Sequence, residues 1–164
     1  ITDWRRQWRS DFPFYFVQLA NFMESKKIQP DSEWAALREA QTKALKLDQV
    51  GMVVTIDIGL ADDIHPKNKQ EVGRRLALVA LAGSYGKNVS SSAPVFQNYI
   101  IKGNKMELDF GQKQDGFQIK GTTLKGFTIA GPDRVFYPAE AMVHDGKIIL
   151  SSTEVPAPDR KSVV

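Results

Sequence analysis

The chain of 164 residues contains no cysteine, which excludes disulfides, thiolate metal sites and cysteine nucleophiles. The redox compartment stays open, because secreted proteins can also lack cysteine. No apolar run approaches the roughly 20 residues that a membrane-spanning helix needs. The 22 basic and 19 acidic residues form no block of like charge. We therefore expect neither nucleic acid nor a membrane as a partner.

Histidine is also scarce, and the two histidines are His65 and His144. They lie far apart in the sequence, and no cysteine is present to complete a zinc site, so we expect no zinc site. His144 stands directly before Asp145-Gly146, a pair typical of a hairpin turn, and is expected to be exposed there. His65 is therefore the histidine to consider for chemistry.

The residues that are present have the composition of a globular protein, with 42% hydrophobic and 25% charged residues. The first part alternates helical and strand patterns, which predicts an α/β fold with a parallel sheet. Its tryptophans have helical spacing and are expected in the core rather than stacked on sugar rings. The expected elements are a helix through Trp4 and Trp8, a strand over 12–19 buried on both faces, a helix over 33–45 capped by Asp31 and containing Trp34, a strand over 51–58, and a helix from Pro66 to about Ala82.

The pattern changes at the short linker 90–94, after which strands and turns predominate. Gly103-Asn104 and Asp145-Gly146 each separate two apolar segments and predict two β-hairpins. We therefore expect an α/β domain over 1–88, followed by a small antiparallel, β-sandwich-like module over 89–158.

The two ends of the chain suggest a sequence that has been cut. Residues 159–164 have no structural logic after the last expected strand, and, followed by a stop, they can be read back through the genetic code as one translation of a widely used short-read sequencing adapter. We expect an artefact tail there and leave it out of the fold prediction. The chain begins on Ile1, so the region that would hold a signal peptide is not present in it, and the absence of a leader is uninformative.

The candidate site is the string Asp62-Asp63-Ile64-His65-Pro66. It lies in the loop after the strand expected at 51–58, and chemistry in α/β sheets collects at the carboxyl ends of strands. A carboxylate beside an imidazole fixes its tautomer and stabilises the imidazolium formed when it takes a proton. The alternative is a solvated acidic loop that caps the next helix, with a surface histidine.

The longer segment 63–77, from Asp-Ile-His-Pro to Arg-Arg-Leu-Ala, closely resembles the carboxyl-terminal block of the sialate O-acetylesterase family, a branch of the SGNH (GDSL-like) hydrolases. Other segments resemble that family in the same order, and the resemblance extends to about Pro158. These segments are Phe-Val-Gln-Leu-Ala at 16–20, Trp34 with Leu-Arg-Glu-Ala-Gln at 37–41, Thr-Ile-Asp-Ile-Gly at 55–59, and the strings at 125–127 and 136–139.

The resemblance implies a serine esterase that removes acetyl groups from sugar hydroxyls, without a metal and without a cofactor. It also implies part of a three-layer SGNH-hydrolase fold, with a flavodoxin-like parallel sheet, and a periplasmic or secreted location. The family's Asp-x-x-His motif falls on Asp62 and His65, with His65 as general base and acid and Asp62 as its orienting partner. Asp63 is the rival for that role, since it is the acidic residue of the Asp-Ile-His-Pro string.

The family's nucleophilic serine and its oxyanion glycine and asparagine belong upstream of the region represented here. No serine of this chain follows a strand in a Gly-x-Ser elbow, including Ser10, Ser25, Ser84 and Ser90 to Ser92. We therefore expect the carboxyl-terminal portion of a carbohydrate O-acetylesterase that is inactive alone. Alternatives are an acetylxylan-type esterase and a non-catalytic carbohydrate-binding module.

Polar residues near the end of the first strand could contact an acetylated carbohydrate. Gln18 and Asn21 are the candidates, and the alternative for both is an amide that closes a turn. Arg38 and Gln41 lie one helical turn apart and are expected to bond loops or backbone around the site. The sugar, its acetylated position and the oligomeric state stay open.

Overall fold

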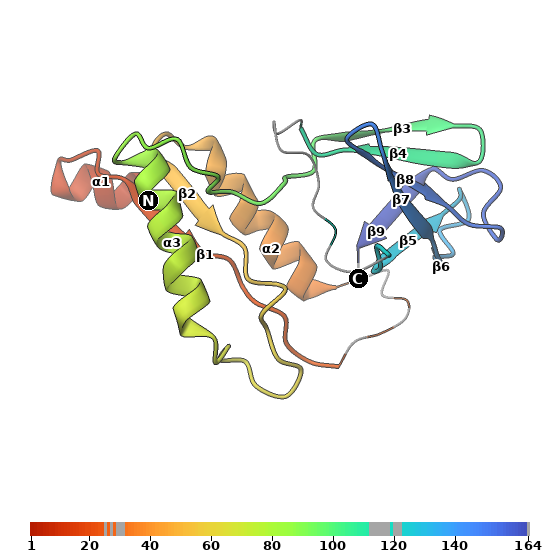
Figure 1. Ribbon diagram of the computed structural model, residues 1–164, viewed down its shortest axis with the longest axis horizontal. Coiled ribbons are helices and arrows are strands. Elements are labelled where there is room, and N and C mark those ends of the chain that lie inside the picture. The colour runs from red at the N-terminus through yellow and green to blue at the C-terminus, as the bar shows by residue number, and fades with distance from the viewer. Residues whose placement is uncertain (25, 27, 29–31, 112–118, 120–122, 164) are drawn as a thin grey trace. The chain divides into compact units, whose positions relative to one another are not determined.

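A computed structural model describes residues 1–24, 26, 28, 32–111, 119 and 123–163 (Figure 1). The chain divides into two compact units, and the break along the chain falls between Ala93 and Pro94. This lies five residues after the boundary expected from the sequence. No helix in the described part of the chain is long and apolar enough to cross a membrane.

The first unit is an α/β structure around a two-stranded parallel sheet. Phe14 pairs with Val50, and the register continues to Val17 opposite Val53. Helix α3 packs on both strands. The elements of this unit are α1 (Thr2–Trp8), β1 (Phe14–Val17), α2 (Glu33–Lys43), the 3-10 helix η1 (Ala44–Lys46), β2 (Val50–Val53) and α3 (Lys69–Gly83).

Helix α3 approaches the sheet closely because β2 carries a glycine at the contact. A Cβ on Gly51 would lie 2.4 Å from Cγ1 of Val79, the buried residue of α3, and 2.9 Å from the Tyr15 ring. At the far end of α3, the Tyr15 and Ser84 hydroxyl oxygens lie 2.6 Å apart. The carboxyl-terminal part of the helix is therefore fixed against the parallel pair.

Strand β2 is shorter than the sequence predicts. The β-branched run continues to Ile58, but the strand ends at Val53 and a turn follows, in which the Ile58 N–H donates to the Thr55 carbonyl at 3.2 Å. The physical reason is that side chains replace the strand hydrogen bonds. The Val54 carbonyl accepts from the Arg75 guanidinium, and the Thr55 hydroxyl donates to the Gln18 carbonyl.

Both long helices begin at a cap other than the expected one. Ser32 caps α2 by accepting from the Ala35 N–H at 3.2 Å, and Asp31 lies outside the described residues. Helix α3 begins at Lys69 and not at Pro66, because the Asn68 side chain accepts from the Glu71 N–H at 3.1 Å. Short polar side chains thus set both starts.

The expectation that the tryptophans pack in the core is wrong for α1. Trp4 is 51% and Trp8 68% exposed, and their rings contact Phe14 and Phe12 at centroid distances of 5.5 and 5.1 Å. Strand β1 is half-buried rather than buried on both faces, and Val17 at its end is exposed. The aromatic surface of this unit is therefore more open than its sequence suggests.

The second unit is antiparallel β-structure, as expected. A four-stranded sheet has the order β3-β4-β8-β7, and a three-stranded sheet has the order β6-β5-β9. The strands are β3 (Asn98–Lys102), β4 (Lys105–Asp109), β5 (Phe127–Ala130), β6 (Tyr137–Pro138), β7 (Glu140–His144), β8 (Lys147–Ser151) and β9 (Arg160–Val163). Both predicted hairpins form, with positive φ at Gly103, Asp145 and Gly146.

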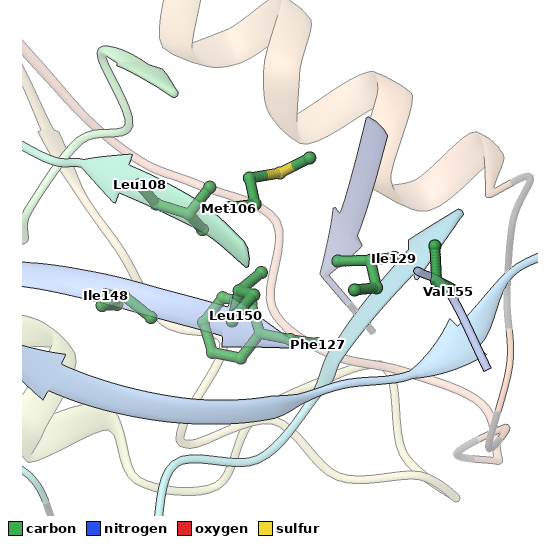
Figure 2. Close-up of a cluster of buried hydrophobic side chains, with 7 residues drawn as sticks. All are labelled: Met106, Leu108, Phe127, Ile129, Ile148, Leu150 and Val155. Carbon is green, nitrogen blue, oxygen red and sulfur yellow. The ribbon is translucent and has the colours of Figure 1, made fainter. Parts of the chain in front are cut away.

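The core of the second unit consists of apolar side chains from β4, β5 and β8 and from the loop after β8 (Figure 2). Met106, Leu108, Ile129 and Leu150 have no exposed surface. Fully burying such side chains stabilises the fold by about 1.5–3 kcal/mol each relative to leaving them in water. The remaining members of the cluster are Phe127, Ile148 and Val155.

Arg160–Val163 belongs to the segment that was left out of the fold prediction, but in the structure it pairs with β5. Backbone groups on the β5 edge need partners, and an extended segment of almost any sequence can supply them. This pairing does not bear on the origin of the segment, so an artefact tail stays a prediction.

Candidate active site

The loops that follow β1 and β2 lie together at the carboxyl ends of the two strands. The Met23 N–H donates to the Ala61 carbonyl at 3.0 Å, which joins the loops through their backbones. A Cβ on Gly59 would lie 2.3 Å from the Asn21 carbonyl oxygen, so the approach requires glycine. The loop that carries His65 is therefore packed against the loop that carries Asn21.

His65 and Asp63 form the carboxylate–imidazole pair of this region. One Asp63 carboxylate oxygen accepts from the His65 N–H at 2.9 Å and lies 3.5 Å from Nδ1 of the ring. The backbone N–H of His65 lowers the pKa of Asp63, and the charge of Lys67 adds to the effect. The His65 side chain is 83% exposed, so the ring is accessible to a reacting group.

Asp62 does not contact the ring in this structure. Its side chain is exposed, and among the described residues Asp63 is the carboxylate within 4 Å of the imidazole. The position two residues before His65 is thus closer to the ring than the position three residues before it. The choice between the two carboxylates as catalytic partner stays a prediction.

Gln18 lies in the interior rather than at the surface. It is 7% exposed, and its side-chain nitrogen donates to the Arg38 carbonyl at 2.9 Å and to the Thr42 hydroxyl at 3.1 Å. Both contacts are with α2, so the amide joins the end of β1 to this helix. This geometry favours the structural alternative for Gln18.

Asn21 is exposed at the junction of the two loops. Its side-chain oxygen accepts from the Arg38 guanidinium at 3.2 Å, and burial lowers the pKa of Arg38. The Gln41 side chain accepts from the Leu19 N–H at 3.0 Å. Arg38 and Gln41 therefore bond the loop after β1, as expected from the sequence.

Trp34 also supports this loop. Its indole nitrogen donates to the Ala20 carbonyl at 2.8 Å, and its ring lies 5.8 Å from Phe22 between centroids. The ring is half-buried and packs locally, as a structural residue does.

Arg75 is a functional candidate that sequence reasoning missed. Its guanidinium donates to the Val54 carbonyl, to both Asp57 carboxylate oxygens and to Glu71, at 2.7 to 2.8 Å. The hydrogen bonds from Arg74 and Arg75 lower the pKa of Glu71 to about 2. The four-residue spacing of Glu71 and Arg75 on a helix was a signal for that pair, but nothing in the spacing indicated Asp57.

No hydrogen bond joins the His65 ring to a serine within the ranges that the structure describes. Ser84 and Ser32 have the structural partners given above, His144 is exposed at its hairpin as expected, and Ser25 lies outside the described residues. Those ranges also contain no group of three or more histidine, aspartate or glutamate residues that could hold a metal ion.

The α/β unit with this pair in the loop after a parallel strand occurs in a chain that is homologous to carbohydrate acetylesterases. It is 36% identical to a mouse (Mus musculus) sialate O-acetylesterase over an alignment of 114 residues, which covers 58% of this chain and 21% of the mouse protein. Its sequence is 40% identical to that of a carbohydrate acetylesterase from Xanthomonas citri, and its structure superposes on the crystal structure of that protein with a TM-score of 0.86.

That structural match covers 98% of this chain and 38% of the Xanthomonas citri chain. The chain thus spans about a fifth and about two fifths of the lengths of these two relatives. No family model matches the chain. The mouse relative confirms the resemblance to sialate O-acetylesterases that the sequence suggested, and the Xanthomonas citri structure confirms a resemblance to carbohydrate acetylesterases.

Proposed function

We propose that this chain supplies the acid/base part of a carbohydrate O-acetylesterase site, with His65 as the catalytic residue. The observation that carries the proposal is the Asp63–His65 pair in the loop that follows β2, in a homologue of two acetylesterases. We also propose that β1 and β2 are strands of a three-layer SGNH-type sheet.

The proposed reaction is acyl transfer in two steps. A serine hydroxyl attacks the acetyl carbonyl while His65 takes its proton, and the imidazolium then gives that proton to the departing sugar oxygen. Water next attacks the acetyl-serine, again with His65 as base, and releases acetate and the free serine. No serine in the described ranges hydrogen-bonds the His65 ring, and this supports our proposal that the chain does not hydrolyse esters alone.

The carboxylate acts by holding the neutral ring in one tautomer. Asp63 lies beside Nδ1, which favours a proton on Nδ1 and leaves Nε2 free to accept the serine proton. The 3.5 Å separation is longer than a hydrogen bond, and such contacts in unliganded sites often shorten when substrate binds. Asp62 remains the rival partner, three residues before the ring as in the Asp-x-x-His motif.

Nitrogen chemical shifts of the His65 ring test this assignment, because they report the tautomer directly. The wild-type ring is expected mainly as the Nδ1–H tautomer at a pH where it is neutral. Asp63→Asn is expected to change the tautomer ratio and Asp62→Asn to leave it unchanged. The reverse order would assign the role to Asp62, and no effect of either substitution would overturn the dyad.

The proposed substrate is an acetyl ester on a sugar hydroxyl. An O-acetylated sialic acid is the first candidate for that substrate, because the mouse relative is a sialate O-acetylesterase. Exposed Asn21 is the proposed substrate contact, and Gln18 acts on it only through the position of the loop. Acetate release from O-acetylated sialic acid and from acetylated xylan is expected to be equal for the wild-type chain and His65→Ala. Hydrolysis that Ser10→Ala abolishes would contradict the proposed inactivity.

A further inference from the structure

Arg75 makes hydrogen bonds to three separate parts of the first unit. Nη1 donates to the Val54 carbonyl at 2.7 Å and, with Nη2, forms a two-point contact with Asp57 at 2.7 Å for each bond. Nε donates to Glu71 at 2.8 Å. One planar guanidinium therefore joins the end of β2, the loop after it and the first turn of α3.

These contacts lie at both ends of the loop that carries His65. Val54 and Asp57 belong to its beginning, and Glu71 follows the Asn68 cap that ends it. Between them, the backbone at Ala61 is bonded to Met23. The segment 62–67, which holds the carboxylate and the imidazole, is thus short and spans fixed points.

We infer that Arg75 is a positioning residue, which holds the loop so that the Asp63 carboxylate stays against His65. This inference rests on the proposed function in that it gives the positioned ring a catalytic role. The geometric part stands on the contacts of Arg75 alone. Contact between two side chains that are two residues apart needs one defined backbone turn. A turn whose ends are not fixed samples many other backbone conformations.

The Arg75 contacts are of the kind that contributes measurably to the stability of a local structure. Isolated ion pairs at the surface contribute little, because solvent screens them and long side chains lose rotamer freedom. The Arg75 side chain is 23% exposed, and its two-point contact with Asp57 and its bond to a backbone carbonyl fix the guanidinium plane. Lysine offers no such plane, so it cannot make this set of bonds.

Arg74 provides a matched control on the same helix. It also binds Glu71 with two hydrogen bonds of 2.7 Å, but its side chain is 60% exposed and no hydrogen bond from it reaches Val54 or Asp57. Arg74→Gln therefore removes a charge and a Glu71 contact while leaving the loop bonds of Arg75 in place.

The test compares Arg75→Gln, Arg75→Lys and Arg74→Gln by nuclear magnetic resonance of the full chain. Two quantities are measured: the carbon-13 titration of the Asp63 carboxyl, and the amide order parameters over 58–65 and at Lys67. The signals of α3 and β2 are the check on folding. In Arg75→Gln and Arg75→Lys the His65 order parameter is expected to fall below about 0.6. The Asp63 carboxyl is expected to titrate closer to its ordinary range, because the His65 N–H no longer faces it.

Arg74→Gln is expected to match the wild type in both measurements. Unchanged values in folded Arg75→Gln, or equal changes in Arg74→Gln, would overturn the inference. Should Arg75→Gln not fold, Asp57→Ala decides, since it removes both carboxylate oxygens that accept from Arg75 and is expected to loosen the same segment. None of these measurements uses hydrolysis, so a failure of the esterase proposal would leave them interpretable.

Discussion

Gly59 is the position at which the loops after β1 and β2 touch, and replacing it tests whether this contact holds the site together. A Cβ there would lie 2.3 Å from the Asn21 carbonyl oxygen, 2.6 Å from its nitrogen and 2.9 Å from its carbonyl carbon. All three are backbone atoms, so no side-chain rotation relieves the clash. Gly59→Ala must therefore separate the two loops.

The expected cost follows from overpacking, which destabilises folded proteins by about 1–3 kcal/mol. Alanine also reduces the entropy of the unfolded chain, which offsets about 0.4–1 kcal/mol of that cost. The midpoints of the two ranges, about 2 and about 0.7 kcal/mol, give a net loss of about 1.3 kcal/mol in the free energy of unfolding of the first unit, with an upper limit of about 2.6 kcal/mol.

Gly73 is the matched control, because it lies exposed within α3 and a Cβ there meets nothing within 4 Å. Alanine favours a helix interior over glycine by about 0.8–1 kcal/mol. The same chemical change is thus expected to stabilise the unit at Gly73 and to destabilise it at Gly59.

The assay is urea unfolding followed by tryptophan fluorescence. All three tryptophans of the chain, Trp4, Trp8 and Trp34, lie in the first unit, so the signal reports that unit alone. The Met23 amide proton, which is hydrogen-bonded to the Ala61 carbonyl, is expected to exchange with solvent faster in Gly59→Ala than in the wild type. Equal stability of Gly59→Ala and the wild type, with unchanged exchange at Met23, would refute the packing of the two loops.

Three further predictions concern other contacts. The pKa of Glu71 is about 2 in the folded state against an ordinary 4.5, so its pairing stabilises the unit above about pH 4.5 and is lost as the pH falls toward 2; Glu71→Gln should remove this part of the pH dependence of the urea midpoint. Thr55→Val leaves the Gln18 carbonyl without its buried donor and should cost about 1–3 kcal/mol in fluorescence-monitored unfolding. Leu150→Ala in the second unit should cost about 2–5 kcal/mol, measured by hydrogen exchange of the β8 amides.

Local sequence patterns predicted the elements whose signals are themselves local. Glycine and asparagine or aspartate at two-residue turns fixed both hairpins, and helical spacing predicted α2 and α3. The predicted end of β2 is wrong, because the β-strand propensity of the sequence extends to Ile58. In the structure the Val54 carbonyl instead accepts a hydrogen bond from Arg75, 21 residues further along the chain. A strand end set by a distant side chain leaves no local pattern.

The candidate site was predictable in its position but not in its support. The loop after β2 could be assigned because strand ends collect chemistry in α/β folds. Gln18, at the matching end of β1, was equally plausible as a ligand, and its burial depends on where α2 packs. Asn21 and Gly59 meet across 38 positions, a contact that spacing alone does not reveal.

The spacing of Asp63 and His65 determines which substitution isolates the catalytic charge. The same Asp63 oxygen accepts from the His65 N–H and faces its ring, so this carboxylate shapes the turn as well as the field at the imidazole. Asparagine keeps an oxygen that can accept from the N–H two residues on, and it removes only the charge. Alanine removes both functions. A tautomer change in Asp63→Asn with an ordered loop would therefore report electrostatics, whereas a change confined to Asp63→Ala would show that Asp63 acts on His65 through the backbone turn.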